Sequence, residues 1–394
     1  MRASRTHGTA LLRRVGSDVQ KSVGMDRKNP NPDLHAHRPA PIGRLDADPE
    51  VIVFNLKKRY TGVSATVNAL VPLQTTQWRL GYCGSVLPNG LSGMPLAQAM
   101  ILSRKPARNR KFRIWHVRRD HEMAAAIFAR DILRLPIRLV FTSAAQHLHG
   151  PFPRWLISKM DAVIATTDVA ASWVPNASAV VPHGIDLERF GIEPDKLTAW
   201  IGSGLPGQFG IGVFGRVRPD KGTDVFVDAM LQALPRLPGV CAIIAGLAQP
   251  QHRAFEQGLR ERVRRAGMSQ RIIFLGQVAP EEIPTWYQRC LLCVACPRYE
   301  PFGLTPFEAA AAGCALVCSR TGAFEQLVSP GLNGELVPTG DVCALSEAVV
   351  RVLSDLNAAI RMGQRARETV AQRFSLQAEA AGIGRVYQGL FDGQ

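Results

Sequence analysis

Short runs of β-branched and apolar residues alternate with longer helical stretches from about residue 50 to the end of the chain. This alternation is typical of βαβ units, which build parallel sheets covered by helices. The first half predicts strands near 51–56, 78–82, 112–117, 137–142, 162–166 and 179–182. The second half predicts strands near 209–215, 240–246, 271–275, 291–296, 315–318 and 335–337. We therefore expect an α/β protein with two sheets, each large enough for a doubly wound domain.

The length of the chain also favours two domains, because 394 residues exceed the size at which one hydrophobic core keeps growing. Glycines and prolines gather near 190–208, where we place the join. The predicted parts are a basic, disordered extension at 1–45, an N-terminal Rossmann-like domain at 46–195, a C-terminal Rossmann-like domain at 196–375 and a terminal helix at 376–394. The sequence leaves open whether Met1 or Met25 is the true start.

The chain is strongly basic, with a formal net charge of +15. Residues 1–45 hold nine Lys and Arg against three Asp and Glu, so +6 lies there and +9 lies in the rest. An excess of this sign fits nucleic acid, phospholipid headgroups or a phosphorylated glycan as partner. No run approaches the roughly 20 apolar residues of a membrane span, and no apolar segment follows the basic N-terminus. We therefore expect a cytoplasmic protein.

Eight cysteines in a cytoplasmic protein are expected to be thiols. Cys290, Cys293 and Cys296 have a spacing that imitates part of an iron–sulfur motif. They lie in an apolar run that reads as a buried strand, where alternation would turn Cys293 away from the other two. We interpret them as core residues and predict no metal site.

The first motif with a chemical meaning follows the predicted strand at 209–215. That strand ends at Gly215 and is followed by Arg216 and Lys221, just before a helix expected from Thr223. A glycine there lets the backbone pass close to a ligand, and cations beside a helix N-terminus attract anions. The pattern fits a diphosphate pocket, although a solvated turn with two surface cations fits it equally well.

The second motif runs from Glu300 to Glu308 and reads Glu-Pro-Phe-Gly-Leu-Thr-Pro-Phe-Glu. Thr305, Pro306 and Glu308 have the spacing of a capping box with proline at the first helical position. Helix capping would explain Glu308 but not Glu300. Paired carboxylates at the rim of an anion-binding helix end suit the hydroxyls of a sugar and a ribose.

Two glutamates separated by seven residues, with Gly-Arg-x5-Lys-Gly upstream, resemble the family 4 glycosyltransferases from about residue 50 to the C-terminus. The resemblance implies a GT-B fold, in which two Rossmann-like doubly wound domains face a central cleft, and a retaining reaction. It implies Arg216 and Lys221 at the donor diphosphate, Glu300 at the transferred sugar and Glu308 at the ribose. The donor-binding residues that it implies are Gly62, Gly215, Arg216, Lys221, Glu300, Phe302, Gly303, Leu304, Thr305 and Glu308.

Within this family, the stretches 115–123 and 181–186 resemble lipopolysaccharide core mannosyltransferases. The resemblance implies GDP-mannose as donor and a Kdo-bearing lipid A core, an anionic glycolipid, as acceptor. The matching family position also places His116 beside the reacting sugar, and this histidine lies near the end of a predicted strand, where ligands collect. The predicted catalytic residues are thus His116, Glu300, Arg216 and Lys221.

Cations in the first half suggest the acceptor side of the site. Lys57, Lys58 and Arg59 follow the first strand, in a loop where the family often has two adjacent glycines and this chain has only Gly62. With Arg118 they form the predicted acceptor-binding set, although surface solvation remains an equal alternative for the loop. A further cluster of six cations at 104–113 suggests peripheral contact with the cytoplasmic face of the inner membrane, a solvated loop being the alternative.

A metal-dependent transferase would place an Asp-x-Asp just after a strand. Asp46-Ala47-Asp48 is the sole match and precedes the first strand, where we expect it to be solvated, so we predict that no metal or other cofactor is required. Alternative readings are a UDP-sugar transferase acting on another acceptor, a nucleotide-sugar epimerase, a phosphorylase and a nucleic-acid-binding protein. The 104–113 cluster holds one aromatic residue, which disfavours stacking on nucleic acid, and no such partner is expected. The sequence leaves the donor base, the sugar, the acceptor, the linkage and the oligomeric state open.

Overall fold

The computed structural model describes residues 45–57, 62–87, 90–145, 147–174, 176–193 and 195–393. The predicted disordered extension therefore lies, apart from its last residue, outside the described residues. Lys58 and Arg59 of the predicted acceptor set also lie outside them.

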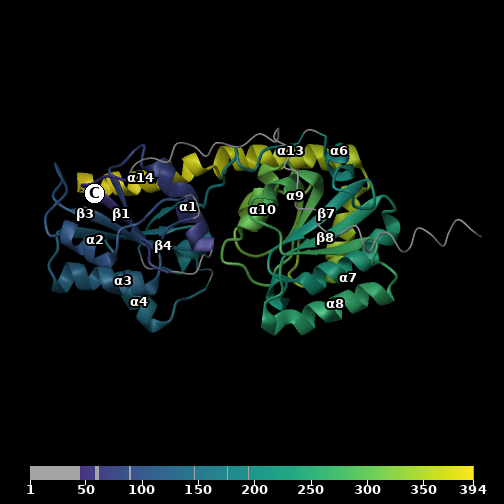
Figure 1. The fold of residues 1–394 in the computed structure, drawn as a ribbon, viewed down its shortest axis with the longest axis horizontal. Helices are drawn as coiled ribbons and strands as arrows, with labels where there is room; N and C mark the ends of the chain where they lie inside the picture. Colours follow the sequence, from purple (N-terminus) through teal and green to yellow (C-terminus); the bar gives the residue numbers. More distant parts are fainter. Residues whose placement is uncertain are drawn as a thin grey trace, which may run out of the picture. The chain divides into compact units, whose positions relative to one another are not determined.

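All twelve predicted strands are present, each within two residues of its expected position, and they form two parallel six-stranded sheets (Figure 1). In the first sheet the strands are β1 Val51–Asn55, β2 Leu80–Gly84, β3 Arg113–Val117, β4 Ile137–Ser143, β5 Ala162–Ala165 and β6 Ala177–Val180. In the second they are β7 Phe209–Phe214, β8 Val240–Ala245, β9 Ile272–Gly276, β10 Cys290–Ala295, β11 Ala315–Ser319 and β12 Gly334–Val337. Helices cover both faces of a parallel sheet, so central strands such as β1, β3, β8 and β10 are buried along their whole length.

The first sheet has the strand order β2-β1-β3-β4-β5-β6. Its connections contain α1 Gly62–Gln74, α2 Leu96–Leu102, α3 Asp120–Ile127, the π-helical turn η1 Phe128–Ile132, α4 Pro151–Ser158 and α5 Asp168–Ser172. The order reverses between β1 and β3, which makes the space beyond their carboxyl ends the topological switch point where ligands bind in doubly wound sheets.

The second sheet has the order β12-β11-β10-β7-β8-β9, with the reversal between β7 and β10. Its larger helices are α6 Lys196–Ile201, α7 Thr223–Ala233, α8 Arg253–Arg265, α9 Ile283–Arg289, α10 Leu304–Ala311, α11 Phe324–Leu327, α12 Val342–Leu353 and α13 Leu356–Arg373. Short 3₁₀ turns are η2 Pro219–Lys221, η3 Leu234–Arg236 and η4 Pro250–His252. The predicted motifs at 215–222 and 300–308 follow β7 and β10, the two strands at this switch point.

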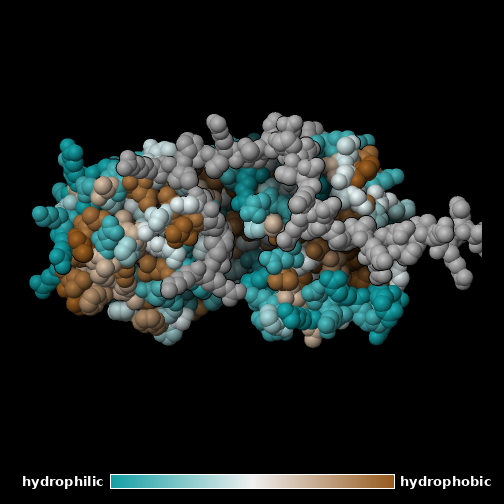
Figure 2. Space-filling view, viewed as in Figure 1, coloured by the Kyte–Doolittle hydropathy of each residue, from teal (hydrophilic) through white to brown (hydrophobic). Residues whose placement is uncertain are grey.

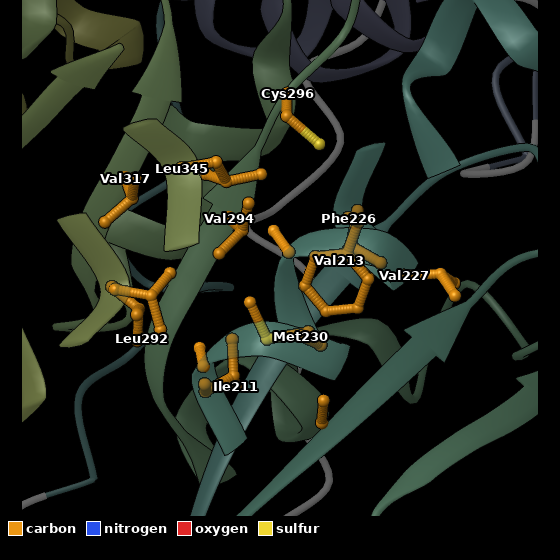
Figure 3. Close-up of a cluster of buried hydrophobic side chains, with 14 of the residues drawn as sticks. Ile211, Val213, Phe226, Val227, Met230, Leu292, Val294, Cys296, Val317 and Leu345 are labelled. Atoms are coloured by element: carbon orange, nitrogen blue, oxygen red, sulfur yellow. The ribbon is translucent and has the colours of Figure 1, made fainter. Parts of the chain in front are cut away.

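The core of the second sheet fixes the positions of these two strands. Figure 3 shows Ile211 and Val213 of β7 with Phe226 and Met230 of α7 in one cluster of buried side chains, which also includes Leu292 of β10. Each of these five side chains is at least nine-tenths buried. Burial of large apolar side chains contributes roughly 1.5–3 kcal/mol each, so β7, β10 and α7 are held as one unit.

The predicted terminal helix is present as α14 Leu376–Asp392, which packs against α1, β5 and β6 of the first sheet. The side chain of Ser375 caps it by accepting a hydrogen bond from the amide of Ala378. Ile383 and Tyr387 of this helix are fully buried in the core of the first sheet. The C-terminal segment therefore completes the core of the N-terminal half.

The three cysteines around β10 are buried thiols, as predicted, but the predicted alternation is wrong in one respect. Cys290 and Cys293 lie in the same hydrophobic cluster, and Cys296 lies in the cluster on the other face. The pairing of β10 with β7 shifts register between Cys290 and Leu292, and this irregularity changes the face on which the following residues lie. Within the described residues no group of His, Cys, Asp or Glu is arranged to hold a metal ion.

None of the helices in the described part of the chain has the length and apolar character that crossing a bilayer requires.

Candidate functional site

The loop after β7 begins a pocket at the switch point of the second sheet. Gly215 has a φ of +129°, and a side chain there would point into open space, so its backbone borders the pocket directly. The turn η2 then leads to Gly222, which has a φ of +68° and precedes α7. A Cβ on Gly222 would overlap the carbonyl oxygen of Cys296, the residue after β10. The left-handed glycine thus lets the two loops meet without a gap.

A bidentate ion pair ties the same two loops together. Arg298 donates to both carboxylate oxygens of Asp224 at 2.8 and 2.7 Å, and its guanidinium also donates to the carbonyl of Pro219. Its backbone amide donates to the carbonyl of Asp220 at 2.9 Å. The β7 loop and the β10 loop are therefore one hydrogen-bonded structure, which sequence spacing did not indicate.

The loop after β10 places Glu300 and the start of α10 against this structure. Gly303 is the N-cap of α10 and has a φ of +86°. A Cβ at Gly303 would overlap the ring of Phe324 and the Cγ of Glu300, so only glycine fits there. The side chain of Glu300 is 15% exposed and forms an ion pair with the ammonium of Lys221, which is 25% exposed.

The predicted capping box is wrong. Helix α10 begins at Leu304, one residue before Thr305, and no side chain caps it. Pro306 is therefore the third helical residue, and Glu308 lies too far into the helix to reach the N-cap amide. Instead, the hydroxyl of Tyr287 donates to a carboxylate oxygen of Glu308 at 3.0 Å. The left-handed Gly303 begins the helix in place of a side-chain cap.

The electrostatics around Glu308 follow from its surroundings. Burial raises the pKa of this carboxyl above its ordinary value, and the hydrogen bond from Tyr287 opposes the rise. The pKa of the fully buried Tyr287 is raised well above its usual range, first by burial and then by the negative charge of Glu308. Glu308 lies on α10 outside the lining of the pocket that contains Glu300, and its predicted contact with a ribose remains a prediction.

One pocket brings together most of the predicted donor residues of the second sheet. Its lining includes Gly215, Arg216, Lys221, Glu300, Gly303 and Thr305. Phe302 is not part of the lining: it is 4% exposed and packs between His183 and Phe307, with ring centroids 4.9 and 5.0 Å away. Leu304 and Glu308 also lie outside the lining, and Gly62 belongs to α1 of the first sheet.

The lining residues that were not predicted include Thr223 and Phe324. Thr223 begins α7 right after the Lys-Gly pair, so its position in the motif could have indicated it. Phe324 lies on α11, more than twenty residues after Glu300, and no local signal pointed to it.

The structure places His116 in the core of the first half of the chain, and its predicted contact with the reacting sugar remains a prediction. The residue is fully buried in β3, and its Nδ1 and Nε2 lie 2.6 Å from the hydroxyl of Tyr387 and 2.7 Å from that of Thr142. Burial, helped by the positive charge of Arg118, lowers the pKa of His116 well below its usual value, so the ring is neutral at pH 7. Both ring nitrogens are occupied, one by Tyr387 of α14 and the other by Thr142 of β4.

The structure also locates three other charged residues of the first half that the sequence analysis named. Lys57 is exposed after β1, and Arg118 is buried at the end of β3. Asp48 is not simply solvated as expected: Arg79 and Arg113 pair with its carboxylate at 3.4 and 2.6 Å. These ion pairs connect the segment before the first strand to Arg79 and to Arg113 of β3.

Two histidines that the sequence reasoning missed follow β4. His147 Nδ1 lies 2.9 Å from the hydroxyl of Tyr299 in the β10 loop, and His149 Nε2 lies 3.4 Å from the hydroxyl of Ser143. Burial, and then the neighbouring His147, lower the pKa of His149. Their position at the carboxyl end of a strand was the available signal.

Two doubly wound parallel sheets, with a pocket lined by cations and by the half-buried carboxylate of Glu300, define a glycosyltransferase of the GT-B class. Residues 205–369 match the family model of glycosyl transferases group 1. The chain is 42% identical to the lipopolysaccharide core biosynthesis mannosyltransferase LpcC of Rhizobium leguminosarum bv. viciae, over 87% of this chain and 97% of that relative. It belongs to the group 1 glycosyltransferases, together with these lipopolysaccharide core enzymes.

Further comparisons agree. The chain is 40% identical to the mannosyltransferase LpsB of Rhizobium meliloti over 87% of this chain and 98% of that relative. The structure of HepE from Anabaena, crystallised with UDP, is similar with a TM-score of 0.75 at 18% identity, covering 86% of this chain and 99% of that one. Sucrose-phosphate synthase from Thermosynechococcus elongatus gives a TM-score of 0.68 at 20% identity, over 87% and 99%. The two structural neighbours establish the fold alone.

Proposed function

We propose that the enzyme transfers mannose from GDP-mannose to a Kdo-bearing lipid A core acceptor, with retention of the anomeric configuration. The observation that carries this proposal is the similarity to LpcC over nearly the full length of that enzyme, combined with a cationic pocket at the switch point of the second sheet. In this proposal the reaction belongs to lipopolysaccharide core synthesis on the cytoplasmic side of the inner membrane.

Arg216 and Lys221 would bind the donor diphosphate beside the N-terminus of α7. As the bond between sugar and phosphate breaks, negative charge develops on the leaving diphosphate, and fixed cations stabilise that charge. Glu300 pairs with Lys221 in the structure, and in the donor complex it would accept hydrogen bonds from sugar hydroxyls. The acceptor would attack from the face that the diphosphate leaves, and a phosphate oxygen would take its proton.

No divalent metal is required in this proposal, because Arg216, Lys221 and helix amides supply the positive charge. Donor binding in the presence of EDTA tests this directly. We expect GDP-mannose to raise the melting temperature with EDTA present, and a shift that needed added Mg²⁺ or Mn²⁺ would overturn the metal-free mechanism.

The donor itself is tested by comparing GDP-mannose with UDP-glucose, UDP-galactose and UDP-N-acetylglucosamine in the same thermal-shift assay. We expect a shift with GDP-mannose alone, and its loss in Arg216→Ala. A shift confined to a uridine donor would keep the glycosyltransferase and refute the mannose assignment. Conversion of the donor without any acceptor would indicate an epimerase.

We also propose peripheral contact with anionic membrane lipids, through part of the basic cluster at 104–113. Arg113 is buried and pairs with Asp48, and Arg110 pairs with Glu50, so these two cations stabilise the fold. Arg104, Lys105, Arg108 and Lys111 are exposed. Near an anionic surface, cations contribute on the order of 1 kcal/mol each, which gives roughly 4 kcal/mol for four.

Apolar side chains on the same half of the protein could add to this contact. On α4, Phe152 is 60% exposed and Trp155 is 49% exposed, and their rings are stacked with centroids 6.1 Å apart. Figure 2 shows hydrophobic surface in the region where Figure 1 labels α3 and α4. Flotation with anionic liposomes at low salt should fall when the four exposed cations are changed to Ala. Equal flotation of this variant would remove the cluster from the proposal.

A further inference from the structure

A buried cation that has no carboxylate partner among the described residues lies at the switch point of the first sheet. Arg118 directly follows β3, and β3 and β1 are the two strands between which the sheet order reverses. The residue is 7% exposed. Its guanidinium donates one hydrogen bond, from Nη1 to the hydroxyl of Thr66 on α1 at 3.2 Å. The Nε–H is buried and has no partner among the described residues.

The buried carboxylates on this side of the sheet are committed to other groups. Glu122 accepts from the backbone amides of Leu56 and Arg118 at 2.9 and 2.8 Å and pairs with Arg119 at 3.1 Å. Glu379 on α14 accepts from His183 and from the amide of Gly184, at 2.9 and 2.8 Å. In the described residues no acidic side chain forms an ion pair with Arg118.

The buried charges near the end of β3 therefore do not balance. Arg118 and the half-buried Arg119 supply two positive charges, and the buried Glu122 supplies one negative charge, while the carboxylate of Asp120 is exposed to solvent. The positive charge of Arg118 acts on two buried neighbours. It helps to lower the pKa of His116, and it opposes the rise in the pKa of Tyr387. Buried charges in proteins are normally paired, so an unpaired guanidinium at a ligand-binding edge indicates a missing anionic partner.

We propose that Arg118 binds an oxyanion of the acceptor, a carboxylate on the sugar that receives the transferred residue, and thereby selects acidic acceptors. This inference rests on the proposed function, because it concerns the acceptor side of the same transferase. The planar fork of a guanidinium matches a carboxylate or a phosphate with two parallel hydrogen bonds. The hydroxyl of Thr66 accepts from Nη1, and the buried Nε–H has no partner among the described residues. A phosphate monoester on the acceptor has the same chemistry, and the experiment below separates the two sources.

The test compares three acceptor probes: the methyl glycoside of Kdo, the same glycoside with its carboxyl reduced to an alcohol, and a neutral sugar glycoside bearing a phosphate monoester. Binding of each probe is measured by calorimetry without donor, and KM is measured by mannosyl transfer. The proteins are the wild type, Arg118→Met, Arg118→Lys and Arg154→Met. Arg154 is an exposed arginine of α4 and serves as the matched control.

For the carboxylate probe we expect Arg118→Met to weaken binding and raise KM by roughly 10- to 100-fold, the loss of a charge-assisted hydrogen-bonded pair. The carboxyl-reduced probe should bind the wild type and Arg118→Met equally weakly. Arg118→Lys should recover part of the binding, because it keeps the charge and loses the fork. Arg154→Met should match the wild type. If the phosphate probe alone shows the dependence on Arg118, the oxyanion is the phosphate and the carboxylate assignment is refuted.

A structural role for Arg118 makes a different prediction. If the side chain only supports the fold, Arg118→Met lowers the melting temperature and weakens acidic and reduced probes alike, which would overturn the proposal. Loss of an unpaired buried cation should instead leave the melting temperature unchanged or raise it. Failure of the proposed function is distinguishable: GDP-mannose would then give no thermal shift in any variant, whereas binding of the acidic probe would still depend on Arg118.

Discussion

Removal of the Lys221 ammonium tests whether fixed positive charge at the end of β7 drives the reaction. Lys221 pairs with Glu300 at a site where the two side chains are 25% and 15% exposed, so water screens the charge only partly. A unit charge about 4 Å from a diphosphate oxygen contributes roughly 4 kcal/mol at an effective dielectric constant of about 20. Loss of one preorganised donor at a developing charge costs roughly 2.7–4 kcal/mol. We therefore expect Lys221→Met to lower kcat/KM by about 10²- to 10³-fold.

The division of this loss between kcat and KM is part of the prediction. Charge on the diphosphate grows as the glycosidic bond breaks, so kcat should fall more than KM rises. Initial rates of mannosyl transfer at several GDP-mannose concentrations give both constants. Lys159→Met, at an exposed lysine that follows α4, is the matched control and should leave both constants unchanged. A loss of less than tenfold, or one confined to KM, would refute electrostatic stabilisation by Lys221.

Stability separates this effect from damage to the fold. The pair between Lys221 and Glu300 is partly exposed, and pairs of this kind contribute roughly 0–1 kcal/mol. The unfolding free energy of Lys221→Met, measured by urea titration, should therefore stay within about 1 kcal/mol of the wild type.

Three further predictions concern the structure around the site. Gly222→Ala should lower the unfolding free energy by roughly 2–4 kcal/mol and weaken donor binding, because a Cβ there overlaps a carbonyl oxygen of the β10 loop. Gly267 has a φ of +69° but open space around it, so Gly267→Ala should lower the unfolding free energy by only about 1 kcal/mol. Equal losses of unfolding free energy in the two variants would contradict the steric argument. Tyr287→Phe removes a hydrogen bond that lowers the pKa of Glu308. The pKa of Glu308 is raised in the folded protein, so the folded state binds the proton more tightly than the unfolded state does. The free energy of unfolding therefore falls as the pH rises from 4.5, the ordinary pKa, through the pKa of Glu308 in the folded protein. Urea titrations across this range should show a larger fall for Tyr287→Phe than for the wild type, and parallel curves would rule out the coupling. Finally, a thiol reagent should label one cysteine of the native protein, Cys343, because the other seven cysteines are buried. Labelling of more than one thiol, or any labelling of the Cys343→Ser variant, would contradict this burial.

The sequence predicts the sheets well because their signal is local. A parallel strand covered on both faces is a continuous apolar run, as in β1 and β10, and such runs can be located within two residues. The glycines at 215, 222 and 303 are equally local signals, and each adopts a positive φ. Six of the predicted donor residues meet in one pocket for this reason: their loops follow strands that the topology brings together.

The local sequence does not show the partners that distant residues supply. His116 appeared available to a ligand in the sequence, but Tyr387, 271 residues later, bonds its ring from α14. Glu308 has the spacing of a residue in a capping box, but helix α10 begins after the left-handed Gly303. The hydroxyl of Tyr287 donates a hydrogen bond to the carboxylate of Glu308 instead. Periodicity and spacing contain no information about such partners, so a local pattern is assigned a local role.

The two switch points treat positive charge differently, and this difference has a physical consequence. At the second sheet, Lys221 has a carboxylate partner in Glu300, so an anion that binds the Lys221 ammonium must displace an existing contact. At the first sheet, Arg118 is more deeply buried and has no such partner among the described residues. An anion that binds the buried guanidinium of Arg118 forms an ion pair away from water and does not have to displace a carboxylate partner. This ion pair therefore discriminates strongly between charged and neutral ligands. Under the proposed function, Lys221 is therefore suited to stabilise charge that develops during the reaction, and Arg118 is suited to select a charge that the acceptor already carries.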